Sequence, residues 1–218
     1  SRVFRSDVIG QAPQDAILID CSTIDVATAR EVEKAAADAG YAMVDAPVSG
    51  GIAAASGGTL TFMVGGSDDA FARAEPVLSA MGKAVIHAGG AGAGQAATIC
   101  NNMLLGIHMI GTCEAFTMAQ KLGLDPQTFY DISSVSSGQN WSMTSYCPVP
   151  GVGPQSPADN GYKGGFATAL MLKDLKLAME AADSAGMETP LGAHAKALYE
   201  KFAEGHSDLD FSAIIKTL

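Results

Sequence analysis

The feature that most constrains this fold is a change of pattern near residue 90. Before it, short apolar runs alternate with segments of helical spacing, whereas only helical segments and one long loop follow it. Strands that alternate with helices are typical of an α/β layer, and helical segments alone indicate an all-α domain. We therefore predict an α/β domain over residues 1–90 and an all-helical domain over residues 91–218.

In the α/β part, "AILIDCST" at residues 16–23 is typical of a strand buried on both faces of a parallel sheet. Gly40 is placed to end the helix that precedes it, and Ser67 to cap the helix that follows it. The spacing predicts strands within residues 41–51, 58–66 and 84–90, and helices over 25–39 and 67–81.

In the helical part, the spacing predicts one long helix over residues 93–122, closed by Gly123. Asp125 and Pro126 are suited to the cap and first turn of the next helix. Further helices are expected over 168–185 and 190–204, with a final turn or two over 210–218. Residues 136–165 have the composition of a loop, and their aromatic residues favour an ordered loop that covers something. These aromatic residues are Trp141, Tyr146 and Tyr162.

Charge and composition exclude several classes of function. A net charge of −10 argues against nucleic acid and anionic membranes as partners. No apolar run approaches the roughly 20 residues that cross a bilayer. The four histidines are scattered, so no metal site is expected. The cysteines lack metal or redox spacing, which indicates small apolar residues in a reducing compartment; they are Cys21, Cys100, Cys113 and Cys147.

Three segments carry candidate chemistry, each with a simpler alternative. "DAPVSGG", Asp45 to Gly51, follows a strand, so its backbone N–H groups and the Ser49 hydroxyl are suited to an anion such as a carboxylate. An ordinary glycine-rich turn is the alternative. In "CSTID", Ser22 or Thr23 is suited to cap a helix. Lys173 and Lys176, in "LMLKDLKLA", are alternatively solvated surface lysines.

The stretch "GAGQAATICNN", Gly92 to Asn102, opens the long helix. Gln95, Thr98 and Asn102 recur at spacings of three and four, which places them on one side of an otherwise apolar helix. A polar stripe of this kind indicates a site or a buried network. The stretch contains no Lys, His, Asp or Glu that could move a proton.

Together with "SSGQNW", "YCPVPGV" and "GGFATALMLKDL", these segments resemble the β-hydroxyacid dehydrogenase family, in the same order and over nearly the whole chain. The resemblance implies the C-terminal part of a Rossmann-like nucleotide-binding domain, followed by a helical domain for substrate and oligomerisation. It further implies NAD-dependent oxidation of 3-hydroxyisobutyrate to methylmalonate semialdehyde, in valine breakdown. The SSGxxW…PVPGV loop favours this substrate over those of the tartronate semialdehyde and 6-phosphogluconate relatives.

The resemblance also implies roles for single residues. Ser49, Gly50 and Gly51 would hold the substrate carboxylate, and Asn102 would orient the substrate. On the cofactor side, Thr23 and Lys173 would contact NAD. Phe166 would lie close to the nicotinamide, and Asp174 would help to position its neighbour Lys173.

The sequence departs from the family pattern in two places. The family opens with a strand, a G-x-G-x-x-G turn and a helix that binds the pyrophosphate. Here the first residues correspond to a point well inside that domain, so we expect part of a longer chain, with weak NAD binding if it stood alone. The second departure is Thr98, which stands where the family carries its catalytic Lys. A hydroxyl cannot titrate near neutral pH, so the proton-transfer step is expected to be impaired.

A catalytically silent relative that acts as a binding or scaffold protein is therefore the alternative to an enzyme. In either case the long Ala- and Met-rich helix is apolar on most faces, which predicts self-association as a dimer or tetramer. The expected location is the cytoplasm, or the mitochondrial matrix if a preceding segment carries a targeting sequence.

Overall fold

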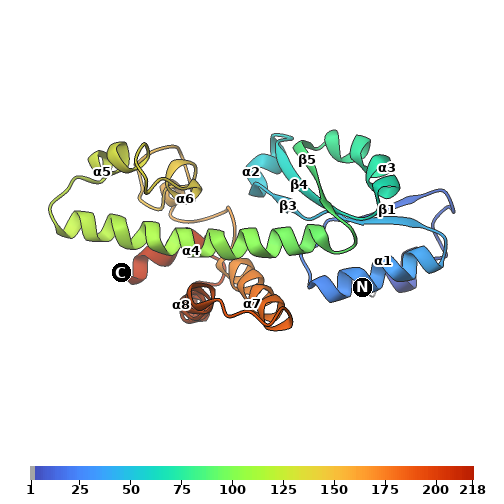
Figure 1. The fold of residues 1–218 in the computed structure, drawn as a ribbon. Helices are drawn as coiled ribbons and strands as arrows, with labels where there is room; N and C mark the ends of the chain where they lie inside the picture. The colour runs from blue at the N-terminus through green and yellow to red at the C-terminus, as the bar shows by residue number, and fades with distance from the viewer. Residues whose placement is uncertain (1–2) are drawn as a thin grey trace. The chain divides into compact units, whose positions relative to one another are not determined.

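The computed structural model describes residues 3–218, which form two compact units, one ending at residue 100 and the other covering residues 101–218 (Figure 1). The first unit is a sheet with helices, and the second is helical. The predicted order, an α/β part followed by an all-α part, is confirmed.

The sheet of the first unit is mixed, not purely parallel. Its order is β1-β2-β4-β3, and β5 also pairs with β4. The pairs β1/β2 and β4/β5 are parallel, whereas β4 runs antiparallel to β2 and β3. The sequence did not predict the short α2 helix, which lies between β3 and β4 where the chain reverses direction. The elements are β1 (Ile17–Asp20), β2 (Ala42–Asp45), β3 (Val48–Ser49), α2 (Gly51–Ser56), β4 (Leu60–Gly65) and β5 (Gly82–Gly89).

The two longer helices of this unit cover opposite faces of the sheet (Figure 1). Neighbouring residues of a strand point to opposite faces, and accordingly Met43 packs with α1 (Val26–Asp38) whereas Val44 packs with α3 (Asp68–Ser79). The predicted strand at β1 exists, but its residues alternate between half-buried and buried, so it is not buried on both faces. A π-helical turn, η1 (Phe4–Val8), packs with the α1 cluster.

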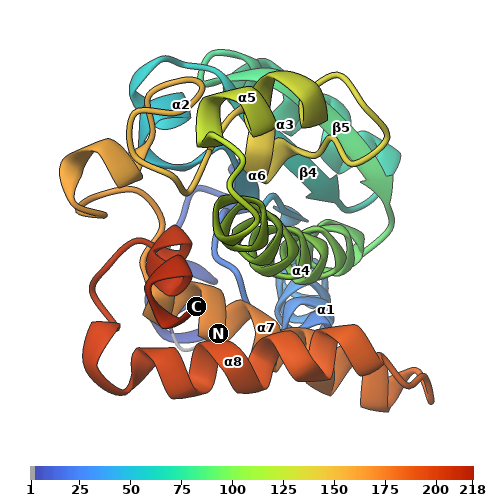
Figure 2. The same cartoon turned by 90° about the vertical axis from the view of Figure 1, so that its left-hand side faces the viewer.

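The second unit is built on α4 (Ala93–Lys121), which begins in the first unit. Figure 2 shows α7 and α8 side by side beneath α4, and the 3₁₀ helix η3 packs against α8. Tyr199, Phe211 and Met171 are among the fully buried side chains of the core. The elements after α4 are α5 (Pro126–Ser133), α6 (Trp141–Thr144), η2 (Pro157–Asn160), α7 (Thr168–Ser184), α8 (Pro190–His206) and η3 (Phe211–Thr217).

The segment over residues 136–165 is ordered, as predicted, but it is more than a loop because α6 and η2 lie within it. Met143, Cys147 and Val152 pack with Phe116 of α4 in a separate small core. Trp141 stacks on Tyr146, with ring centroids 4.9 Å apart. This segment of small and polar residues therefore carries apolar contacts of its own.

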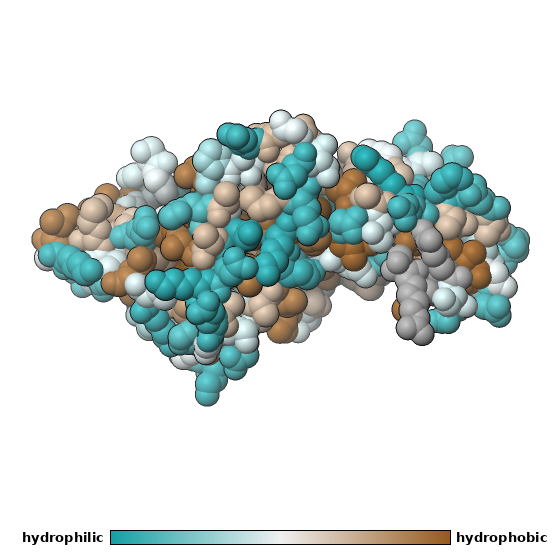
Figure 3. Space-filling model, turned by 90° about the horizontal axis from the view of Figure 1, so that it is seen from below, coloured by the Kyte–Doolittle hydropathy of each residue, from teal (hydrophilic) through white to brown (hydrophobic). Residues whose placement is uncertain are grey.

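Within residues 3–218, none of the helices combines the length and hydropathy that a membrane span requires, and no group of side chains is arranged to hold a metal. In this described part all four cysteines are free. Cys113 and Cys147 are buried, whereas Cys21 and Cys100 are exposed. Seen from below, the surface is hydrophilic over much of its area, with hydrophobic residues between (Figure 3).

Candidate functional site

Asp45, at the carboxyl end of β2, holds the first turn of α4. Its Oδ1 accepts the Gly92 N–H at 2.9 Å, and its Oδ2 accepts the Gln95 N–H at 2.8 Å. The side chain is buried, and burial raises the pKa of its carboxyl against the opposing effect of these two hydrogen bonds. A helix N-terminus favours a negative charge, so Asp45 satisfies amides that the helix itself leaves unpaired.

Gly94 of "GAG" and Gly65 of β4 are both required by this close approach. A Cβ on Gly94 would collide with the Met63 carbonyl oxygen and would lie 2.7 Å from the Asp45 carbonyl oxygen. A Cβ on Gly65, at the end of β4, would collide with the Asp45 carboxylate. The glycine-rich joint therefore serves to pack the start of α4 directly on the strand ends.

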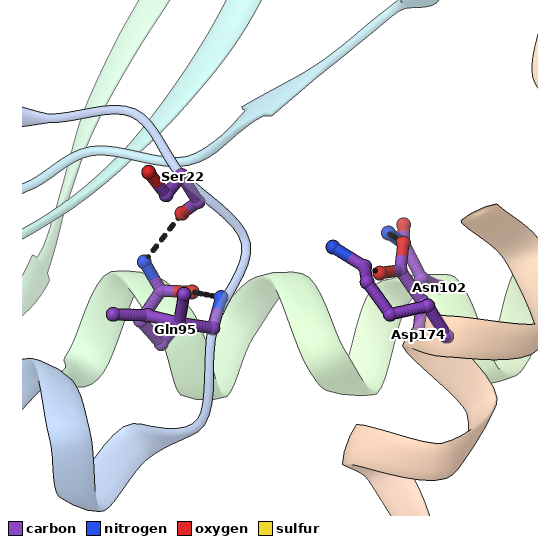
Figure 4. Close-up of polar contacts among 6 residues, drawn as sticks. Ser22, Gln95, Asn102 and Asp174 are labelled. Carbon is purple, nitrogen blue, oxygen red and sulfur yellow. Dashed lines mark hydrogen bonds and ion pairs between the residues drawn. The ribbon is translucent and has the colours of Figure 1, made fainter. Parts of the chain in front are cut away.

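Gln95 is a second fixed point at the strand ends (Figure 4). Its Nε2 donates to the Ser22 carbonyl at 2.8 Å, and its Oε1 accepts the Ile24 N–H at 3.0 Å. Both ends of this buried amide are thus bonded to backbone on either side of Thr23, which is half-buried. The helix cap of this segment is Asp25, whose side chain accepts the Thr28 N–H, so neither Ser22 nor Thr23 caps α1.

The Ser-Gly-Gly segment makes a sharp turn at the end of β3. Gly50 has φ +126° and Gly51 has φ +67°, both in the region that favours glycine. A Cβ on Gly50 would meet the Ala54 side chain at 2.5 Å, whereas one on Gly51 would meet no atom within 4 Å. Ser49 is half-buried and pairs with Thr61 of β4. Gly50 and Gly51 are exposed, so this turn lies at the surface beside the half-buried Ser49.

Thr98 is fully buried in the first unit. Its hydroxyl donates to the Met63 thioether sulfur at 3.5 Å, and sulfur is a weak acceptor. The side chain at this position therefore makes one weak polar contact and has no group that titrates.

One turn further along α4, Asn102 belongs to a polar cluster of the second unit (Figure 4). Its Nδ2 donates to Asp174 Oδ2 at 2.7 Å, and its Oδ1 accepts from Asn101 at 3.0 Å. Lys173 Nζ lies 3.3 Å from Asp174 Oδ1, which is buried and has no hydrogen-bond partner among residues 3–218. Burial raises the pKa of the Asp174 carboxyl, against the opposing effects of Lys173 and Asn102.

Other predicted positions are placed as follows. Phe166 is half-buried, and its N–H donates to Asp210 at 2.8 Å. Lys176 pairs with Glu200 of α8 at 3.5 Å, which agrees with its reading as a surface lysine. Sequence reasoning assigned no role to Asp45 or Asp210; the only signal was that each lies at the end of a strand or the start of a helical turn.

Polar groups suited to a nicotinamide dinucleotide lie in each unit. In the first unit, Thr23 lies on backbone that Gln95 fixes beyond the end of β1, where ligands of α/β sheets bind. In the second, Lys173 supplies a partly exposed cation, and Asp174 Oδ1 holds it through the 3.3 Å ion pair. The structure brings Asn102, Lys173 and Asp174 together.

Comparison with known proteins identifies the family. Residues 92–218 match the family described as the NAD-binding domain of NADP-dependent 3-hydroxyisobutyrate dehydrogenase, and residues 2–90 match the NAD binding domain of 6-phosphogluconate dehydrogenase. The chain is 51% identical to the probable 3-hydroxyisobutyrate dehydrogenase of Mycobacterium tuberculosis. The 213 matched residues are 98% of this chain and 72% of the relative. The chain belongs to the β-hydroxyacid dehydrogenase family.

Two further members support this assignment. The 3-hydroxyisobutyrate dehydrogenase of Pseudomonas aeruginosa is 54% identical over 203 residues, 92% of this chain and 68% of the relative. A solved structure of the Mycobacterium tuberculosis enzyme with L-serine has a TM-score of 0.93 at 50% identity, covering 99% of this chain and 75% of that one. The predictions of an NAD-dependent 3-hydroxyacid dehydrogenase, a nicotinamide cofactor and a small-molecule substrate are confirmed at the level of the family.

Proposed function

We propose that this protein oxidises 3-hydroxyisobutyrate to methylmalonate semialdehyde with NAD, and that Thr98 lowers the rate of this reaction. The observation that carries the proposal is the amide of Asn102, which Asp174 and Asn101 hold one turn beyond position 98 of α4. A relative named for this activity, at 54% identity, supports the choice of substrate.

Each residue has a proposed role. The turn at Ser49, Gly50 and Gly51 binds the substrate carboxylate through backbone amides and a hydroxyl, because its positive φ angles turn the backbone away from the strand. The Asn102 amide binds the substrate hydroxyl, since its own orientation is fixed by two side chains.

The cofactor side is proposed to consist of Thr23, Lys173 and Phe166, with Asp174 positioning Lys173 through their 3.3 Å ion pair. When bound, NAD supplies the acceptor for the hydride of the substrate carbon. Thr23 and Lys173 would bind its polar groups, and Phe166 would exclude water beside its nicotinamide ring.

The proposed impairment follows from the chemistry of position 98. Oxidation of an alcohol requires a base that takes the hydroxyl proton, and a threonine hydroxyl does not titrate near neutral pH. Loss of such a group costs roughly 10²- to 10⁴-fold in rate. Because Thr98 is bonded to Met63, even its hydrogen-bonding capacity is partly used.

The test is Thr98→Lys, assayed by NADH formation with 3-hydroxyisobutyrate. We expect the rate to rise by about 10²-fold or more. Thr98→Met, which lengthens the side chain without adding a titratable group, is the matched control and should give no rise. A rise below about tenfold in the lysine variant would contradict the assignment of this position. L-serine, the ligand of the related Mycobacterium tuberculosis structure, and NADP belong in the same assay as alternative substrate and cofactor.

A binding or scaffold protein remains the second candidate, because Thr98 is fully buried against a thioether and offers no acid or base. Calorimetric titration of the unaltered full-length protein with 3-hydroxyisobutyrate and with NAD distinguishes the enzyme from the scaffold protein. Binding without turnover supports the impaired enzyme, whereas no binding of either compound supports the scaffold.

We also propose that the protein self-associates through the helical part. Along α4 and just beyond it, large apolar side chains are exposed in the single chain, with Met118 62% and Leu122 79% accessible. Exposed apolar surface of this kind marks interaction sites. Light scattering after gel filtration should give a dimer or tetramer, and Met118→Glu should lower the mass towards that of the monomer.

A further inference from the structure

Asp210 is a fully buried carboxylate, with an exposed fraction of 0%, that lies just before η3. Its Oδ2 accepts the Tyr146 phenol at 2.7 Å and the Phe166 N–H at 2.8 Å. Its Oδ1 accepts both the N–H and the hydroxyl of Ser212, at 2.9 and 2.5 Å. Four donors therefore converge on one charge, and each oxygen serves a different part of the chain.

The oxygen Oδ2 joins Asp210 to two positions much earlier in the sequence, Tyr146 and Phe166. Tyr146 lies within the segment over residues 136–165, and Phe166 directly follows that segment, just before Ala167, the N-cap residue of α7. The backbone supports the same junction, since the Phe211 N–H donates to the Phe166 carbonyl at 2.8 Å. Gly165 has φ +74°, and a Cβ there would collide with both the Asp210 carboxylate and the Tyr146 hydroxyl. The glycine before Phe166 is thus required by the same contact.

The aromatic rings around this carboxylate form a continuous group, here called the aromatic wall: Trp141, Tyr146, Phe211 and Phe166. Trp141 stacks on Tyr146 at 4.9 Å, Tyr146 lies 5.6 Å from Phe211, and Phe211 lies 5.8 Å from Phe166. Phe211 is buried, whereas Trp141 is 45% exposed and Phe166 is half-buried. The wall therefore runs from the core of the second unit to its surface.

We propose that Asp210 is a positioning residue of the cofactor site, because its carboxylate fixes both Phe166 and Tyr146 in the aromatic wall. This rests on the proposed function, in which Phe166 lies beside the nicotinamide. Asp210 touches neither substrate nor cofactor in this proposal, and acts through the Phe166 backbone and the Tyr146 phenol. Burial, and next the charge of Asp210, raises the pKa of the Tyr146 phenol, so that it remains a donor.

An isosteric amide cannot replace this carboxylate. Two of the four donors are backbone N–H groups, one from Phe166 and one from Ser212, and neither can reverse its direction. An asparagine offers one acceptor oxygen and one NH₂ group. If the NH₂ group stands in place of Oδ2, it opposes the Phe166 N–H and displaces that residue. If it stands in place of Oδ1, it opposes the Ser212 N–H.

The test compares Asp210→Asn with Ser212→Ala, both in the full-length protein carrying Thr98→Lys. Ser212→Ala is the matched control, because it removes one bond to Oδ1 and leaves both bonds to Oδ2. Trp141 is the only tryptophan, so its emission reports the wall directly. We expect Asp210→Asn to shift this emission and to raise the KM for NAD about tenfold, with kcat changed less than threefold. Ser212→Ala should leave the emission and the KM within about twofold of the parent.

Two results would overturn the proposal. One is a folded Asp210→Asn variant with the parent's Trp141 emission. The other is a shifted emission with an unchanged KM, which would make Asp210 a purely structural residue. If the Thr98→Lys parent has no activity, binding of NADH is measured instead by energy transfer from Trp141. Weaker NADH binding in Asp210→Asn alone would then support Asp210 although the proposed reaction had failed, whereas equal or absent binding in all variants would overturn it.

Discussion

Two amide side chains on α4, Gln95 and Asn102, differ in what holds them. Gln95 is fully buried, and both ends of its amide are bonded to backbone, at Ser22 and Ile24. Asn102 is half-buried and bonded to two side chains, Asn101 and Asp174. Part of the Asn102 side chain is therefore accessible to a ligand, whereas the Gln95 amide is not. One polar stripe on a helix therefore contains both a structural clamp and a residue suited to binding.

The largest effect is expected at Gly94, where the clamped end of α4 packs on the strand ends. Gly94→Ala should lower the free energy of unfolding by roughly 3–5 kcal/mol, because the new Cβ would lie 2.7 Å from the Asp45 carbonyl oxygen and 2.8 Å from its Oδ2. Urea denaturation followed by circular dichroism measures this. A loss below about 1 kcal/mol would mean that the joint can yield, and that it does not fix α4.

The amides themselves provide the next comparison. Gln95→Leu should lower the free energy of unfolding by about 2–3 kcal/mol, because it leaves the Ser22 carbonyl and the Ile24 N–H without their partner. Asn102→Leu should cost about 1 kcal/mol or less, since Asn102 is half-buried, but should weaken binding of 3-hydroxyisobutyrate. Denaturation and calorimetry on both variants give the two quantities. Equal stability losses would refute the distinction.

The sequence predicted much of this fold because its signals are local. The helix at α5 begins where Asp125 and Pro126 indicate, and Asp125 accepts the Thr128 N–H as a cap. The mixed sheet was not predicted, because the direction of β4 depends on how the chain turns through α2 and not on any residue of β4 itself. Strand direction is a tertiary property that periodicity does not contain.

The same limit applies to the site. The spacing of Gln95, Thr98 and Asn102 identified the polar side of α4. It could not show that Gln95 is structural and Asn102 suited to binding, because this depends on partners about 70 residues away. Asp210 was missed for the same reason: its four donors come from three separate parts of the chain. Buried carboxylates that organise a site leave little trace in the local sequence.

The third prediction concerns pH at the Asn102 end. Burial raises the pKa of Asp174 in the folded state, so the folded protein binds this proton more tightly than the unfolded chain. The contribution of Asp174 to stability should therefore fall as the pH rises from about 4, the ordinary carboxyl value, through its raised pKa. Urea denaturation of the wild type and of Asp174→Asn between pH 4 and 7 tests this. The wild type should lose stability relative to the variant with rising pH, and a relative gain would contradict the direction of the shift.

The smallest effect is expected at Gly111, further along the same helix, and it has the opposite sign to that at Gly94. Gly111 is exposed within α4, and a Cβ there would meet no atom within 4 Å. Gly111→Ala should therefore raise the free energy of unfolding by roughly 0.5–1 kcal/mol, because alanine loses less backbone entropy in a helix. The same urea denaturation measures it. A loss of stability, together with a lower mass in light scattering, would instead place Gly111 in the interface between copies of the chain, where a close approach needs the glycine.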